Sequence, residues 1–266
     1  MVKLLVAGGV VYGLIVAGMA LAEPKLVFHP PDLSEDALAA LAQQAGAREI
    51  RVQAEDGTGL YGWRLGQGPR LALLFNGNGS SVAGYGPRYA RFVKAGFEVL
   101  HVNYRGYPGS EGAPAEAGLR MDARAAWAEA RRTHDPQDIV VFGKSLGGGV
   151  AVGLVAGLPP EEKPRALLLE STFTAAVDVA AHAYPWLPVR WVMRNRFDSL
   201  SRAGSLGVPT VLVHGDADAV IPAGQSRRLG EAIPGSTLII VPGGDHNGDM
   251  MAYGPAWEAA RGVMGI

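Results

Sequence analysis

The pattern of apolar and polar residues divides this chain into three stretches. From Leu4 to Ala22 the chain is almost continuously apolar and carries no charged residue. The segments 48–53 and 59–65 instead alternate in polarity and are separated by Glu55-Asp56-Gly57, which predicts an antiparallel β-hairpin. From Leu71 onward, short continuous apolar runs alternate with segments of helical length. Runs of this kind are typical of strands that are buried on both faces of a parallel sheet.

The alternating stretch predicts the elements of an α/β fold. With the hairpin, its apolar runs predict an eight-stranded, mostly parallel, doubly wound sheet, because strands that alternate with helices pack in this way. A linker over Pro24 to Pro31 and a short helix capped by Ser34 are expected before the sheet. The runs are 71–75, 97–102, 139–142, 166–169, 210–213 and 238–241, and the expected helices are 86–95, 115–133, 146–157, 223–233 and 255–264.

Residues 171–205 interrupt the alternation of strands and helices. They are rich in apolar and aromatic residues but are broken by Pro185 and Pro188. One interpretation is a helix followed by an irregular loop packed on the core. The other is a small helical lid over a binding site, in which Phe173, Trp186 and Trp191 would favour an apolar substrate.

Composition narrows the class of protein. Of the 266 residues 48% are hydrophobic and 18% are charged, which is ample for a globular core. The net charge is −1 and no Lys/Arg-rich run occurs, so nucleic acid is not an expected partner. The chain has no cysteine, which excludes disulfides, thiol catalysis and cysteine-based zinc sites. No internal repeat is evident, and we expect residues 23–266 to form one domain.

Residues 1–22 are expected to be a membrane anchor or a signal segment. As a helix, the apolar run would be about 28 Å long, close to the ~30 Å hydrocarbon core of a bilayer. This length favours an uncleaved anchor, and Lys3 then predicts that the globular domain lies outside the cytoplasm. Ala20-Leu21-Ala22 has the form of a cleavage site, so the alternative is a secreted or periplasmic protein.

One apolar run leads into a motif with chemical content. Residues 138–142 are followed by Gly143-Lys144-Ser145-Leu146-Gly147, which has the form of a nucleophile elbow between a strand and a helix. The serine of such an elbow sits on a strained turn, so its neighbours two positions away must be small. Gly143 and Gly147 meet that requirement.

Two later strands end in the partners that a nucleophilic serine needs. The run 209–214 is followed by Asp216 and Asp218, and the run 237–241 by a loop that contains His246. The carboxyl ends of parallel strands meet at one edge of the sheet, where ligand sites form. We therefore expect Ser145 to be the nucleophile, His246 its general base, and Asp218 or Asp216 the acid that orients the histidine.

With these motifs the chain resembles the α/β-hydrolase superfamily. Within it, the chain is similar to a small membrane-tethered branch related to serine aminopeptidase-like and depalmitoylating hydrolases. The resemblance implies the α/β-hydrolase fold for residues 23–266 and assigns the acid to Asp218, the fourth residue after His214. The segments that carry it are 28–30, 75–79, 103–112, the elbow, 214–218 and 244–247.

The loop after the third strand is expected to complete an oxyanion hole. The backbone N–H of Leu146 would provide one donor and that of Asn78, between two glycines, the other. The resembling branch usually has His-Gly at this loop, whereas this chain has Asn76-Gly77. We expect Asn76 to support the loop through hydrogen bonds of its own amide.

Two further groups of polar residues could belong to a binding site. Arg105 could bind a peptide carboxylate, but an arginine there more often ties loops together. The cluster of histidines and aspartates around His214 and His246 lacks the His spacing of common zinc motifs, so neither a metal nor another cofactor is expected.

The sequence thus predicts a serine hydrolase that cleaves ester or thioester bonds of small acyl substrates through an acyl-enzyme. The N-terminal segment would bring it to a membrane. One alternative is a serine peptidase that acts on short peptides. The other is an inactive hydrolase fold that serves as a scaffold at the membrane.

Overall fold

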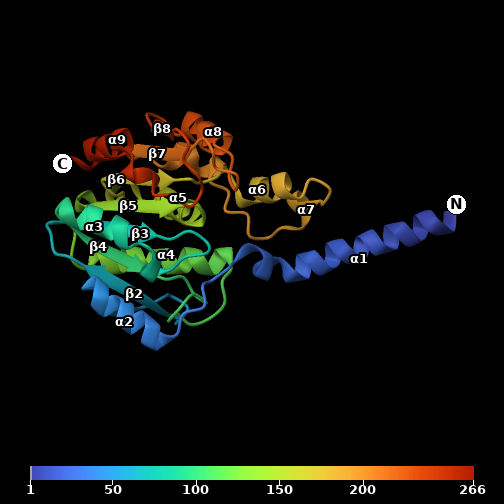
Figure 1. Cartoon of the computed structure of the whole chain (residues 1–266), viewed down its shortest axis with the longest axis horizontal. Helices are drawn as coiled ribbons and strands as arrows, with labels where there is room; N and C mark the ends of the chain where they lie inside the picture. Colours follow the sequence, from blue (N-terminus) through green and yellow to red (C-terminus); the bar gives the residue numbers. More distant parts are fainter. Residues whose placement is uncertain (1) are drawn as a thin grey trace.

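The computed structural model, which describes residues 2–266, contains an eight-stranded sheet with the strand order β1-β2-β4-β3-β5-β6-β7-β8 (Figure 1). β1 and β2 form the expected antiparallel hairpin, β2 pairs antiparallel with β4, and the other neighbours are parallel. The predicted α/β class and mostly parallel sheet are confirmed. The strands are β1 (Arg48–Gln53), β2 (Gly59–Leu65), β3 (Arg70–Phe75), β4 (Phe97–Val102), β5 (Ile139–Lys144), β6 (Ala166–Glu170), β7 (Thr210–Gly215) and β8 (Thr237–Val241).

Helices cover both faces of this sheet, which explains the continuous apolar runs. In β3, Leu71, Leu73 and Phe75 pack in one core with α4, α5 and α8, whereas Ala72 and Leu74 pack in a second core with α2, α3 and α9. Alternate side chains of a strand point to opposite faces, so a strand covered on both sides is apolar throughout. The helices are α2 (Glu35–Ala45), α3 (Gly86–Lys94), α4 (Glu116–Arg131), α5 (Leu146–Gly157), α8 (Gly224–Ala232) and α9 (Gly254–Met264).

The strand order places two loops of interest side by side. β3 lies between β4 and β5 in the sheet. The chain passes from β3 to β4 on one side of it and then returns to form β5 on the opposite side, so the strand order reverses at β3. Phe75 at the end of β3 is in register with Gly143 near the end of β5. Ligands in open α/β sheets bind where the strand order reverses. The loop after β3 and the elbow after β5 flank such a position.

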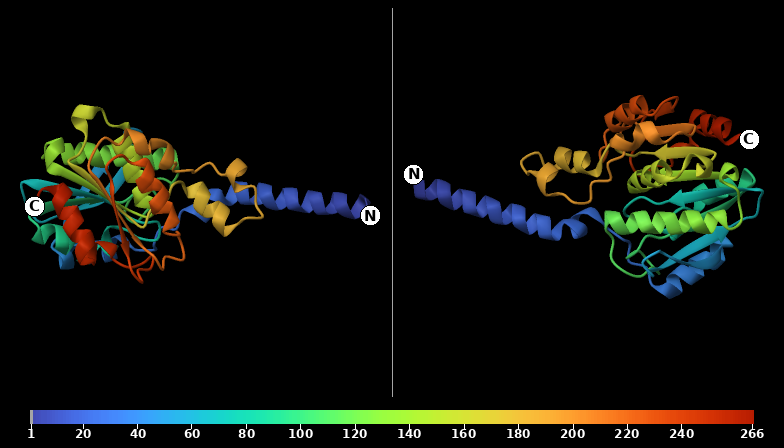
Figure 2. Two further views of the ribbon diagram at one scale, coloured as in Figure 1. Left: turned by 90° about the horizontal axis from the view of Figure 1, so that it is seen from above. Right: turned by 180° about the vertical axis from the view of Figure 1, so that it is seen from behind.

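The N-terminal helix α1 (Val2–Val27) projects from the body of the molecule (Figures 1 and 2). It continues through Pro24, so the expected linker over 24–31 is wrong in its first half. Proline in a helix leaves the carbonyl four residues earlier without its usual donor. Here Arg194 Nη2 donates to Ala20 O at 3.0 Å and replaces that bond. Phe28 then packs edge-on against Phe197, and Ser34 caps α2 as expected.

The segment between β6 and β7 contains two short helices outside the sheet, α6 (Ala176–Ala183) and α7 (Val189–Val192). We call residues 176–193, which lie within the expected 171–205 segment, the lid; a role as a cover over a site stays a prediction. In Figures 1 and 2 the lid extends away from the sheet and lies beside the C-terminal half of α1. The short 3₁₀ helix η4 (Leu200–Ser205) returns the chain to β7.

Candidate active site

Ser145 occupies a strained turn between β5 and α5. Its φ of 52° and ψ of −117° lie outside the regions that non-glycine residues favour. The turn is held by two bonds: Ser145 N–H donates to Glu170 O at 2.9 Å, and Thr172 Oγ1 donates to Ser145 O at 3.0 Å. A Cβ on Gly147 would lie 2.1 Å from Phe75 O, and one on Gly143 would lie 2.3 Å from Gly147 O. Only glycine fits at either position.

A chain of hydrogen bonds connects Ser145 to Asp218 through His246. His246 Nε2 lies 3.1 Å from Ser145 Oγ, and His246 Nδ1 lies 2.7 Å from Asp218 Oδ2. The second oxygen of Asp218 accepts from the backbone N–H groups of Val220 and Ile221 at 2.9 and 2.8 Å. In this geometry neutral His246 carries its proton on Nδ1 and is free to accept one from Ser145 on Nε2.

The two candidate aspartates have different surroundings. Asp216 is exposed, and its carboxylate accepts from Gly243 N–H at 2.6 Å. Asp218 is buried and contacts His246. Burial alone would raise the pKa of Asp218, but hydrogen bonds from His214 and His246 outweigh it and hold the pKa well below its usual range. Asp218 is therefore ionised at neutral pH.

A second histidine contacts the same carboxylate. His214, the fully buried fifth residue of β7, has its Nε2 3.2 Å from Asp218 Oδ2 and 2.7 Å from Ile221 O. Its Nδ1 lies 2.7 Å from Ser226 Oγ, which fixes the ring from the other side. The sequence pattern located His214 in the loop motif but assigned it no role. A histidine four residues before the acid was the available signal.

The loop after β3 lies directly beside the elbow. A Cβ on Gly77 would be 3.6 Å from Ser145 Cβ. Within residues 2–266, the backbone N–H groups of Asn78 and Leu146 donate to no other protein group, and both residues line the cavity at Ser145. The side chain of Asn78 bonds to Val27 O and Tyr107 OH and holds the loop against the end of α1.

Asn76 supports this loop through its amide, as expected. Asn76 Nδ2 donates to Gly77 O at 3.0 Å and to Ser80 O at 2.8 Å. Its Oδ1 lies 3.1 Å from Nε2 of His101, which is completely buried. Burial lowers the pKa of His101 to about 3, so this ring is neutral.

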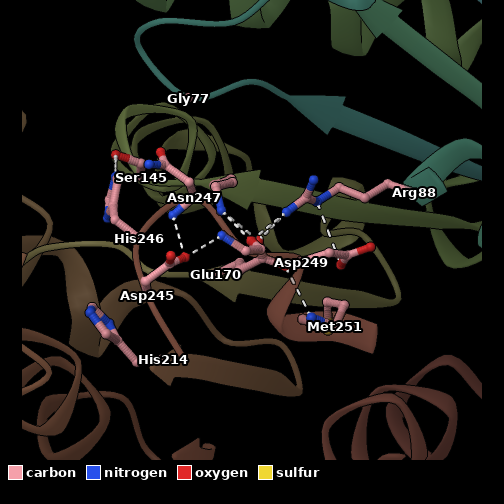
Figure 3. A network of polar contacts seen from close by, with 12 residues as sticks. Gly77, Arg88, Ser145, Glu170, His214, Asp245, His246, Asn247, Asp249 and Met251 are labelled. Carbon is pink, nitrogen blue, oxygen red and sulfur yellow. Dashed lines mark hydrogen bonds and ion pairs between the residues drawn. The ribbon is translucent and has the colours of Figure 1, made fainter. Parts of the chain in front are cut away.

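Behind the elbow, Glu170 joins three segments of the site (Figure 3). This fully buried carboxylate at the end of β6 accepts from Arg88 Nη2 at 2.5 Å, Lys144 Nζ at 2.9 Å and Met251 N–H at 3.2 Å. Arg88 and Lys144 also donate to Gly248 O, two residues after His246. The network therefore ties the loop that carries His246 to the elbow, and nothing in the local sequence pattern indicated Glu170.

A cavity of about 630 Å³ opens onto Ser145 and His246. Its lining includes the polar side chains of Arg88, Lys144 and Asn247, and most of the lining surface is apolar. Phe173 is part of the wall, as expected, whereas Trp186 and Trp191 lie outside it. The apolar wall comprises Leu26, Val27, Leu146, Phe173, Ala176, Val179, Ala180, Ala183, Tyr184, Met193, Val220 and Ile221.

The remaining candidate residues have structural partners. Arg105 is paired with Asp122 of α4 at 2.8 Å and with Asp56 of the β1–β2 turn at 2.7 Å, so its guanidinium ties its loop to neighbouring segments. In the part of the chain that the structure describes, no group of three or more His, Asp or Glu residues is arranged to hold a metal ion.

Comparisons with known proteins agree on the fold and family. The family model described as serine aminopeptidase, S33, matches residues 69–202. An uncharacterised protein of Mycobacterium tuberculosis is 38% identical over 208 residues, which cover 75% of this chain and 72% of that protein. The lysophosphatidylserine lipase ABHD12 of Danio rerio is 31% identical over 159 residues, or 53% of this chain and 41% of the lipase.

Solved structures show the same architecture. An esterase of Pyrococcus furiosus superposes with a TM-score of 0.68 at 16% identity and covers 90% of this chain and 96% of its own. At this identity the similarity concerns the fold alone.

Proposed function

The chain belongs to the α/β-hydrolase superfamily, and on that premise we propose that it hydrolyses esters or thioesters of apolar acyl chains through an acyl-enzyme on Ser145. The observation that carries the proposal is the hydrogen-bonded chain Ser145–His246–Asp218 at a largely apolar cavity. A serine hydroxyl needs an adjacent base to become a nucleophile at neutral pH.

In the proposed reaction, Ser145 Oγ attacks the substrate carbonyl while its proton passes to His246 Nε2. The oxyanion accepts hydrogen bonds from the N–H groups of Leu146 and Asn78. Ionised Asp218 stabilises the imidazolium that forms. His246 then protonates the departing alcohol or thiol. A water molecule, deprotonated by the same ring, releases the acid and restores Ser145.

The test is hydrolysis of a chain-length series of p-nitrophenyl esters by the full chain in detergent micelles. Ser145→Ala should lower kcat by at least about 10⁴-fold, because the nucleophile is lost. Ser201→Ala, at an exposed serine on η4, is the matched control and should be unchanged. Equal rates for wild type and Ser145→Ala would refute the proposal. A fluorophosphonate probe also discriminates an inactive scaffold, because only an activated serine reacts with it.

Peptide hydrolysis is the second candidate, since the matching family model is described as a serine aminopeptidase. An aminopeptidase must bind the ammonium group of its substrate with a free acidic group. However, no Asp or Glu is among the described residues that line the cavity at Ser145, and Glu170 and Asp249 behind it are already paired with Arg88, Arg91 and Lys144. We therefore expect esters to be hydrolysed faster than aminoacyl p-nitroanilides. The reverse order would favour the peptidase.

We also propose that α1 anchors residues 23–266, the hydrolase domain, to a membrane, with this domain outside the cytoplasm. In support, Val6–Val27 is long and apolar enough to span a bilayer, and only 6% of its most apolar window is buried in the protein. The alternative is a signal peptide cleaved after Ala22. The mass of the mature protein and its partition between membrane and soluble fractions distinguish the two.

A further inference from the structure

The lid lies against α1 well within the apolar part of that helix. At the lid tip, Tyr12 OH donates to Trp186 O at 2.8 Å. Directly after the lid, Arg194 N–H donates to Glu23 Oε1 at 2.8 Å and Arg194 Nη2 to Ala20 O. Between these points the two segments enclose a small apolar cavity lined by residues such as Val16 and Leu187. Contacts therefore follow α1 from Tyr12 to Glu23. In Figures 1 and 2 the lid lies beside this helix.

This contact length corresponds to one leaflet of a bilayer. Tyr12 and Glu23 are separated along the helix by about 16 Å at roughly 1.5 Å per residue, and half of a hydrocarbon core is about 15 Å. Glu23 is paired with Arg194, and Lys25 next to it is exposed. If these charges lie at the headgroups, the lid tip reaches towards the middle of the bilayer.

The surface of the lid is suited to hydrocarbon. Trp186 and Trp191 are 58% and 90% exposed, and α1 beside the lid exposes further large apolar side chains, among them Leu14 and Leu21. The charged side chains of the lid are Asp178 and Arg190, which pair with each other at 2.6 Å, and His182 in the last turn of α6 is its exposed basic residue. Asp178 lies in the first turn of α6, near the body, so this pair is placed towards the headgroups.

Part of the backbone of the tip is paired within the protein, as an apolar medium favours, although among the described residues Trp186 N–H has no protein acceptor. Pro185 and Pro188 have no N–H to satisfy. Leu187 N–H donates to Tyr184 O, and Trp191 N–H donates to Pro188 O. The carbonyl of Trp186 accepts from Tyr12, which explains a hydroxyl near the centre of an otherwise apolar helix.

From these observations we infer that the lid, with Trp186 and Trp191, inserts into one leaflet of a lipid bilayer beside α1. The cavity at Ser145 is walled by Leu26 of α1 and by Ala180, Ala183 and Met193 of the lid. An acyl chain would thus enter it directly from the leaflet. The substrate class that follows, a membrane-borne lipid ester, rests on the proposed function, whereas the insertion does not.

The absence of cysteine permits a direct test by site-directed spin labelling of the full chain. Trp186→Cys and Trp191→Cys place a nitroxide on the lid. Val93→Cys, 38% exposed on α3, is the control on the body. The proteins are reconstituted in phosphatidylcholine/phosphatidylglycerol vesicles, and collision with oxygen and with a water-soluble nickel chelate is measured. At both lid sites the collision rate of the nitroxide with oxygen should exceed that with the nickel chelate by at least about fivefold. At position 93 the collision rate with the nickel chelate should be the higher of the two.

Nickel accessibility at the lid sites equal to that at position 93 would overturn the inference. Shielding of the lid sites from both reagents would also overturn it, because that is the signature of burial against protein.

A kinetic test separates insertion from chemistry. The double variant Trp186→Glu/Trp191→Glu should hydrolyse soluble p-nitrophenyl butyrate within twofold of wild type. Its kcat/KM for a long-chain ester embedded in the same vesicles should fall at least tenfold. Unchanged hydrolysis of the embedded ester would contradict insertion. If the protein has no esterase activity, the spin-label result still decides the insertion, and only the proposed function fails.

Discussion

Replacing Asp218 by asparagine changes one atom of the carboxylate that contacts His246. Asp218 Oδ1 accepts from the N–H groups of Val220 and Ile221, so the oxygen of the new amide must remain on that side. Its NH₂ group then faces His246 Nδ1, formerly 2.7 Å from a carboxylate oxygen. A donor at this position requires His246 to accept on Nδ1 and to carry its proton on Nε2. That tautomer cannot take the proton of Ser145.

The expected loss is large because both the tautomer and the charge that stabilises the imidazolium are removed. We expect kcat to fall by about 10⁴-fold, as in other triads. This factor corresponds to about 5.4 kcal/mol of transition-state stabilisation at 1.36 kcal/mol per factor of ten. Asp216→Asn is the matched control. It retains the oxygen that accepts from Gly243, and its side chain is exposed, so its kcat should remain within about threefold.

The assay is steady-state hydrolysis of p-nitrophenyl butyrate at neutral pH, with thermal unfolding of each variant to show that it is folded. A folded Asp218→Asn protein that keeps more than a tenth of the activity would refute the reasoning. So would a crippling effect of Asp216→Asn, because Asp216 does not contact His246.

Three further variants test the framework of the site. Gly147→Ala would place a Cβ 2.1 Å from a backbone oxygen, so we expect it to destabilise the protein severely in urea unfolding. Gly153→Ala is the control, because a Cβ there would have nothing within 4 Å, and it should be neutral or slightly stabilising. Glu170→Gln leaves the buried cationic groups of Arg88 and Lys144 without a counter-charge. It should lower the free energy of unfolding by about 3 kcal/mol and also reduce kcat. A change in the free energy of unfolding below about 1 kcal/mol would contradict the role of Glu170 in holding these segments together. The pKa of His101 is lowered by burial from 6.5 to about 3, so the stability that this neutral ring contributes is complete above pH 6.5 and is lost as the pH falls towards 3. His101 should contribute about 1.4 kcal/mol per pH unit to the slope of the unfolding free energy in that window, and His101→Asn should remove this contribution. Identical slopes in the two proteins would argue against it.

Much of the fold was predictable because the information is local. Buried strands such as β3 are continuously apolar since helices cover both faces of the sheet, and all eight strands were located to within two residues. The elbow was recognisable because its strained turn excludes side chains at Gly143 and Gly147. Strand order in the chain also indicated that loops carrying Ser145, Asp218 and His246 share one edge of the sheet.

Predictions failed or stayed open where a contact joins residues far apart in the chain. A proline at position 24 predicts the start of a linker, but the helix continues through it, and Arg194, remote in sequence, donates to the carbonyl that the proline leaves free. The choice between Asp216 and Asp218 was open from the residues alone, and the direction of a loop in space decided which of them contacts His246.

The α/β class, the positions of the strands and the residue types at one sheet edge follow from the order of the residues, because periodicity and steric demand act within a few residues. That Glu170 and His214 hold the site together, and that the lid lies along α1, follows from the folded arrangement. These arrangements depend on single side-chain contacts between distant segments, and such contacts leave no periodic trace in the chain.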